Sequence, residues 1–128
     1  MPLYANLSEE SSAPTGSTAQ AQIPIGPYKH DAFVLTTAHG SSQYVGPKAN
    51  AGIVLTLNAD GHVVQDDAFE GESSSISFRS AASHNFILDA GKKAVITADI
   101  RPQGAGGVKL NRDTVVHLHV IAIGVVVG

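Results

Sequence analysis

The sequence of 128 residues lacks cysteine and tryptophan altogether, and only 15 % of its residues are charged. Without cysteine, disulfide bonds cannot stabilise the fold, and the redox compartment cannot be inferred. The net charge is −3 with histidine neutral, and the chain has no basic stripe. Because binding to phosphate backbones requires such a stripe, we expect no nucleic-acid partner.

Long hydrophobic runs are also missing. No run approaches the roughly 20 apolar residues that a membrane-spanning helix needs, so we expect no membrane partner. Residues 1–10 include two acidic residues, no basic residue and no apolar core, and therefore do not resemble a secretory signal peptide. We accordingly expect synthesis in the cytoplasm.

The chain is instead rich in small and β-branched residues, with 43 % hydrophobic residues and 13 glycines. Its length predicts one domain, and no segment shows a sustained helical period. The clearest local prediction is a hairpin in which Asn58–Gly61 turns between strands at 53–57 and 62–65. Further strands are expected at 32–37, 76–79, 85–88, 94–100 and 114–123, with loops at 39–42, 46–52 and 102–107. This spacing of short strands predicts an all-β fold, a jelly-roll β-sandwich.

Residues 1–30 differ from the rest of the chain. The stretch 8–18 is polar, rich in turn formers and without periodicity, as linkers and disordered arms are. Two small apolar anchors flank it: Leu3, Tyr4 and Leu7 on one side, Ile23 and Ile25 on the other. We expect an extended N-terminal arm over residues 1–30 that orders on a partner, followed by a jelly-roll domain over residues 31–128. A frayed terminus is the alternative.

The segment 114–123 is apolar on both faces of the strand that it predicts. Because strand side chains alternate, one face carries Val116, Leu118, Val120 and Ala122, and the other carries Val115, His117, His119, Ile121 and Ile123. A second buried face in so small an antiparallel protein indicates either the middle of a sandwich or a subunit interface. We favour a subunit interface formed by the second set.

Candidate catalytic and metal-binding groups are few. His117 and His119 have a spacing that metal sites on β-strands use, but no third local ligand accompanies them, and we interpret them as interface histidines. Asp66 and Asp67 could bind Ca²⁺, although a solvated acidic edge is the simpler interpretation. Ser73–Ser75 does not form the G-x-S-x-G pattern of a nucleophile elbow. We predict no enzyme, no cofactor and no bound metal.

Two segment patterns resemble a known family. Residues 85–97, followed by a glycine-rich loop and a closing apolar strand, look like the later strands of TNF/C1q-like jelly rolls. The chain is also similar, over most of residues 33–124, to the TNF-like, fucose-binding N-terminal domain of bacterial superlectins. The segments that carry this likeness are Met1–Leu3, Gly52–Ile53, Ala68–Phe69, Val108–Arg112, His117 and Ala122–Gly124. The resemblance implies a compact homotrimer in which the last strand lies near a threefold axis.

The resemblance also implies glycan contacts at Tyr44, Arg79 and Arg112. Two departures count against a lectin: the chain has Glu70-Gly71 where that family has a threonine-tyrosine pair, and Val54 where it has a second tyrosine. With three tyrosines, four phenylalanines and no tryptophan, few rings remain for stacking on a sugar.

Two functions from different classes remain. The first is a non-enzymatic structural protein: a trimeric capsid decoration (cement) protein that clamps shell subunits at the surface of a phage or virus, made in the host cytoplasm. The second is a carbohydrate-binding module with sites between protomers, located in the bacterial cytoplasm or at the cell surface. We favour the first, because a cysteine-free chain without a secretion signal, with an extended N-terminal arm and an expected trimer, suits a rigid module held by large interfaces. The arm separates the two functions, since a cement protein needs it to reach its neighbours and a lectin trimer does not. The shell protein and further copies of this chain are then the expected partners, and a glycan is the partner in the alternative.

Overall fold

The computed structural model describes residues 3–12, 19–45, 51–70, 75–104 and 114–125. These residues form eight strands and no helix, so none of them belongs to a helix that is long and apolar enough to cross a membrane. The strands are β1 (Leu3–Ser12), β2 (Ala19–Ile25), β3 (Ala32–Val45), β4 (Ala51–Ala59), β5 (His62–Glu70), β6 (Ser75–Leu88), β7 (Ala94–Gly104) and β8 (Val115–Gly124).

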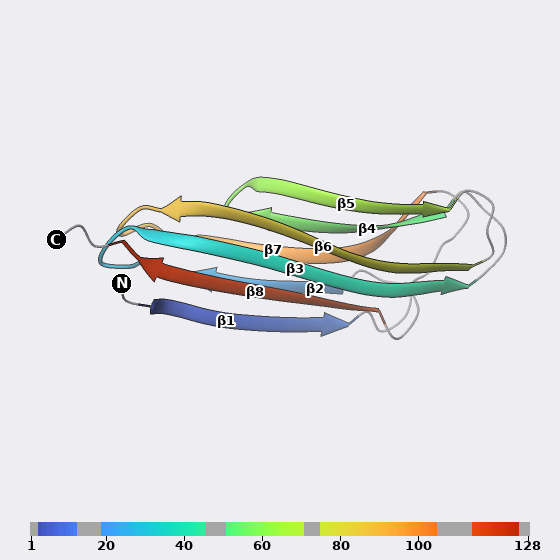
Figure 1. Ribbon diagram of the computed structural model, residues 1–128, viewed down its shortest axis with the longest axis horizontal. Helices are drawn as coiled ribbons and strands as arrows, with labels where there is room; N and C mark the ends of the chain where they lie inside the picture. The colour runs from blue at the N-terminus through green and yellow to red at the C-terminus, as the bar shows by residue number, and fades with distance from the viewer. Residues whose placement is uncertain (1–2, 13–18, 46–50, 71–74, 105–113, 126–128) are drawn as a thin grey trace.

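Two four-stranded sheets pack face to face (Figure 1). The first sheet has the strand order β1-β8-β3-β6 and the second has the order β2-β7-β4-β5. Every pairing within them is antiparallel. The predicted all-β sandwich is therefore confirmed. The strand order is compatible with the jelly-roll winding that we expected, and the TNF-like identity stays a prediction.

One apolar core lies between the two sheets. Because strand side chains alternate, each strand turns every second residue toward the opposite sheet. In β2 burial alternates along the whole strand, and in β8 one of the two apolar faces is completely buried. The largest fully buried side chains are Leu55, Leu57, Ile96, Ile100, Leu118, Val34, Val54, Val116, Val120 and Thr36. Burial of each large aliphatic side chain contributes about 1.5–3 kcal/mol, which makes this core the main source of stability.

The predicted hairpin is confirmed. Strands β4 and β5 are joined by a tight turn at Asp60 and Gly61, whose φ angles are +52° and +85°. Two successive positive φ angles are those of a type I′ turn, which suits the twist of the flanking strands. The Gly61 N–H donates a hydrogen bond to Oδ1 of Asn58 at 3.0 Å. This sequence therefore fixes the β4–β5 register locally.

Asp31 fixes one end of the first sheet. Its carboxylate oxygen Oδ1 accepts a hydrogen bond from the Ala90 N–H at 2.8 Å, and its carbonyl oxygen accepts one from the Val125 N–H at 2.7 Å. The Gly91 N–H donates to the carbonyl of Tyr28 at 2.9 Å. These bonds connect the start of β3, the β6–β7 turn and the end of β8. These bonds therefore tie together the end of the first sheet at which β3 begins and β8 ends.

Five strands are longer than predicted. Strand β3 continues through His39–Ser42 and β7 continues through Pro102–Gly104, both of which we expected to be loops, and β6 is one strand where we expected two. Strand β4 begins at Ala51, inside the loop expected at 46–52, and β5 continues to Glu70. The physical reason is tertiary pairing: β3 is bonded on both sides, by β6 and β8, and Pro102 lies opposite Ile53 of β4. Such pairing outweighs the local preference of Gly and Ser for turns. The predicted loop residues 46–50 and 105–107 lie outside the described residues.

The expectation of an N-terminal arm docking on another molecule is corrected for the residues described. Strand β1 pairs with β8, and β2 pairs with β7, so both belong to the sandwich of their own chain. Ile23 and Ile25 are 2 % and 3 % exposed, and the ring of Tyr4 stacks on Tyr28 with centroids 4.7 Å apart. The reason is that both outer strands find an unpaired sheet edge within the chain, where backbone hydrogen bonds need no apolar periodicity.

Candidate interaction face

The face of the first sheet that points away from the core carries an apolar row across all four strands. The register places Leu3 of β1 opposite Ile123 of β8, Ile123 opposite Phe33 of β3, and Phe33 opposite Ile87 of β6. Leu3 is 60 % exposed, Phe33 37 % and Ile87 52 %, and Ile123 is half-buried. The row lies at the end of the sandwich where β1 begins and β8 ends (Figure 1).

A second row extends this surface along the strands. Ile121 of β8 lies opposite Leu35 of β3, and both are half-buried. Exposed Asn6 and Asn85 flank them on β1 and β6. We call the six aliphatic and aromatic residues of the two rows the apolar end; they are Leu3, Phe33, Leu35, Ile87, Ile121 and Ile123. Contiguous exposed apolar surface of this kind marks interaction sites in soluble proteins.

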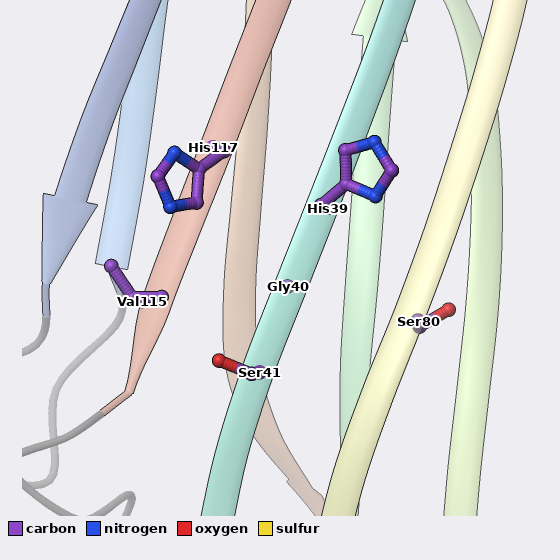
Figure 2. Close-up of a pocket in the computed structure, with 6 residues that line it drawn as sticks. All are labelled: His39, Gly40, Ser41, Ser80, Val115 and His117. Carbon is purple, nitrogen blue, oxygen red and sulfur yellow. The ribbon is translucent and has the colours of Figure 1, made fainter.

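Histidines occupy the next rows of the same face. The Nε2 atom of His119 lies 2.7 Å from Oδ1 of Asn6, at hydrogen-bonding distance. His117 lies directly opposite His39 of β3, and both are exposed. These two histidines, with Gly40, Ser41, Ser80 and Val115, line a pocket of about 260 Å³ (Figure 2). Sequence reasoning missed His39 because it placed residues 39–42 in a loop. Only the β3–β8 register brings the pair together.

The outward face of the second sheet is different in character. Its described positions are mostly polar, and they include Gln20, Gln22, Asn58, Thr97, Asp99 and Arg101 on β2, β4 and β7. Val63 of β5 and Val95 of β7 are exposed apolar residues on the same face. Among the described residues, no hydrogen-bond partner is found for Oδ1 of Asp99, although this atom is buried. Burial raises the pKa of the Asp99 carboxyl, and the charge of Arg101 opposes that shift. The apolar end therefore distinguishes the first sheet from the second.

The predicted interface residues of β8 share one face of that strand, as expected. Val115, Ile121 and Ile123 are half-buried, and His117 and His119 are exposed. The chain itself therefore leaves this face open to solvent, and what covers it stays a prediction. Of the predicted docking residues, Leu3 and Leu7 are exposed, at 60 % and 43 %, whereas Ile23 and Ile25 belong to the core.

The other predicted sites receive no support from the described residues. The backbones of Tyr44 and Arg79 lie in the neighbouring strands β3 and β6, but their side chains and the whole of Arg112 lie outside the described part of the chain. The side chains of Asp66 and Asp67 lie outside it too. Within the described part, no group of three or more His, Asp or Glu residues is arranged to hold a metal ion.

Comparisons with known proteins give no family. No family model matches the chain, and no curated protein is similar to it in sequence. Among solved structures, dimeric latent PorU from Porphyromonas gingivalis is similar with a TM-score of 0.49 and 10 % identity, over 94 % of this chain and 13 % of that chain.

Viral capsid proteins are also among the similar structures. The structure of the infectious bursal disease virus Gx strain has a TM-score of 0.36 at 12 % identity, over 93 % of this chain. The D431N mutant VP2 protein of the same virus, in T=1 particles, has the same TM-score and identity over 95 %. This chain spans 32 % of the length of each of these two chains. Likenesses of this size assign no function.

Proposed function

We propose that this protein is a non-enzymatic structural protein, a homotrimer that decorates and stabilises a phage or virus shell. The observation that carries the proposal is the apolar end, in which Leu3, Phe33 and Ile87 expose between a third and two thirds of their surface on one rigid sheet. Leaving such side chains in water forgoes about 1.5–3 kcal/mol for each one that could be buried completely. A partner that covers this end would gain that energy.

The occupant that this face fits is a second copy of the same chain. The first three rows of the face, which run from Leu3 to the level of His119, contain no Asp, Glu, Lys or Arg on any of the four strands. Identical faces that meet around a symmetry axis place like groups near each other, and like charges there would repel. The absence of charge from these three rows avoids that repulsion there, although the whole chain carries a net charge of −3.

The size of the face is sufficient for a stable contact. Strands lie about 4.8 Å apart and rise about 3.3 Å per residue. Four strands of 10 to 14 residues therefore present a face of roughly 700–800 Å². Specific interfaces bury about 800 Å² per partner. The outward face of the first sheet is thus about as large as the area that one subunit contributes to a standard interface.

The second part of the proposal is that the trimer binds a shell protein. A rigid sandwich whose self-associating face lies on one sheet keeps the largely polar face of the other sheet available for a shell protein. We place the protein on the virion surface, without a nucleic-acid, membrane or cofactor partner. Among the described residues, nothing favours the lectin alternative, which rests on Tyr44, Arg79 and Arg112.

A pair of matched variants tests the interface. Ile87→Asp places a carboxylate in the apolar end, where burial of each charge costs several kcal/mol, so the trimer should dissociate to monomer in sedimentation velocity. Val95→Asp is the control, because Val95 is 46 % exposed on the second sheet, and it should stay trimeric. Equal behaviour of the two variants would contradict an interface on the first sheet.

Binding to shells tests the second half of the proposal. Capsids stripped of decoration should bind the wild-type protein when the two are sedimented together. They should bind Ile87→Asp more weakly, because a monomer presents one shell-binding face instead of three. A trimer that ignores shells but binds fucosylated glycans would replace the shell assignment by the lectin alternative.

A further inference from the structure

We propose that the open edge of β6, over residues 81–87, binds one extended segment of a partner protein as a further strand of the first sheet. Strand β6 lies at the end of that sheet and pairs with β3 alone. An edge strand presents a row of unpaired N–H and C=O groups, which is a template for another strand. Proteins use such strand addition to recognise peptides, and backbone hydrogen bonds then provide the affinity.

The edge of β6 lacks the features by which proteins protect an exposed edge, which are charged side chains, proline, bulges and short strands. Residues 81–87 contain no proline and no Asp, Glu, Lys or Arg. The register of β6 with β3 runs without a shift along the whole strand. The other three edge strands do carry protective features: Glu9, Glu10 and a register shift in β1, Pro24 in β2, and Asp66, Asp67 and Glu70 in β5. Of the four edges, that of β6 is therefore the one suited to a partner strand.

Strand β5 of the second sheet forms a ledge beside this edge. Figure 1 shows β5 lying beyond β6, at the upper border of the sandwich in that view. The ring of His62 on β5 stacks on His84 of β6 with centroids 4.0 Å apart, and His84 stacks on Phe86 with centroids 6.2 Å apart. His62 is nevertheless exposed, and Val64 is half-buried against the core. The side of β5 that faces the first sheet is therefore only partly covered, and a strand added to β6 would cover it.

The ledge determines which kind of partner fits. A whole sandwich that approached this edge would meet the protruding β5 before its own sheet could pair with β6, whereas a single extended segment fits in front of β5. Side chains that the segment turns inward would contact His62, Val64 and Phe86. Because strand side chains alternate, we expect an uncharged segment with an apolar residue at every second position. Under the proposed function, on which this choice of partner rests, the segment belongs to the shell protein.

This contact and the apolar end use different groups of the same sheet. The added strand would bond to backbone groups that point sideways from β6, in the plane of the sheet. The apolar end, which includes Ile87, consists of side chains that stand roughly perpendicular to that plane. Loss of one contact can therefore be measured separately from loss of the other.

Titration of the intact protein with the uncharged peptide acetyl-TVTVTVT-amide tests the edge directly. In amide NMR spectra, the peptide at about 1 mM should shift the signals of residues 81–87 and leave those of the β1 edge in place. The same peptide methylated on every backbone nitrogen cannot donate backbone hydrogen bonds, and it should bind roughly tenfold more weakly or worse. The proposal is overturned if residues 81–87 do not respond, or if methylation leaves the affinity unchanged.

Two neighbouring residues of β5 provide matched variants for the ledge. His62→Asp places a carboxylate where the added strand would bury it, and burial of an unpaired charge is costly, so peptide binding should weaken by roughly tenfold or more. Val63→Asp is the control, because Val63 is 51 % exposed on the outward face of the same strand, and its binding should match that of the wild type. Equal binding by both variants would contradict a strand lying over β5.

Amide hydrogen exchange of the protein bound to stripped capsids tests whether the shell protein supplies the segment. Exchange at residues 81–87 should slow on binding, because those amides would gain partners or become covered. A protein that binds the peptide but no capsid would overturn the choice of the shell protein and leave the edge site standing. Capsid binding that leaves exchange at residues 81–87 unchanged would overturn the role of this edge and leave the shell function standing.

Discussion

Replacing Ile23 by alanine tests whether the N-terminal segment belongs to the fold. Ile23 is 2 % exposed and lies beside Ile96, which is fully buried. The substitution removes three buried carbon groups, worth about 0.8 kcal/mol each, and leaves a cavity that adds to the loss. We expect the free energy of unfolding to fall by about 3 kcal/mol. In a chain of this length that corresponds to a melting temperature lower by roughly 10 °C.

The measurement is thermal unfolding followed by far-UV circular dichroism at matched protein concentrations. Leu3→Ala is the control from the same segment, because Leu3 is 60 % exposed in one chain. At concentrations where the protein is monomeric, that variant should stay within about 0.5 kcal/mol of the wild type. If Ile23→Ala also stays within 0.5 kcal/mol, β2 does not contribute to the core and the segment is a dispensable arm after all.

Two further predictions concern single positions in the second sheet and its turns. Gly26→Ala should destabilise the fold by roughly 2 kcal/mol or more, since φ is +79° and an added Cβ would collide with the Lys92 carbonyl oxygen. Gly61→Ala should lower the free energy of unfolding by only about 1 kcal/mol, because φ is +85° there but no described atom lies within 4 Å of the added Cβ. If urea denaturation gave equal losses for the two variants, the clash at Gly26 would be contradicted. Burial raises the pKa of the Asp99 carboxyl, so the folded state disfavours its charged form and loses stability as the pH rises through the folded pKa. Asp99→Asn should therefore melt above the wild type at pH 7 and match it at pH 3, and an equal effect at both pH values would refute this assignment.

Local patterns predicted the parts of the fold that local forces determine. The β4–β5 turn follows from Asn58–Gly61, whose residue types suit positive φ and a side-chain bond to the backbone. The alternation along β8 identified its two faces correctly, because one residue in two must meet the core. The class of the fold, an all-β sandwich, followed from the number and spacing of such segments.

Other parts of the fold depend on distant pairings that no local pattern reports. Residues 39–42 have the composition of a turn, yet β3 is extended there because it has neighbours on both sides. We expected an arm over residues 1–30, but β2 is an edge strand of the second sheet, where Pro24, which has no N–H, is tolerated. The acidic, aperiodic stretch of β1 pairs through its backbone with β8.

The candidate site combines both kinds of information. The sequence identified the outward residues of β8, but it could not place Leu3, Phe33 and Ile87 beside them, because those residues are far apart in the chain and meet only through the registers of four strands. His39 entered the site for the same reason. The apolar end and the histidine pair are products of topology.

The measurement that tests the central claim most directly is native mass spectrometry of the wild-type protein, supported by sedimentation equilibrium at micromolar concentration. A chain of 13.2 kDa should give a dominant species of three times that mass, which disappears when Ile87 is replaced by aspartate. A wild-type protein that remains a 13.2 kDa monomer at all accessible concentrations would contradict the claim that the outward face of the first sheet joins copies of this chain.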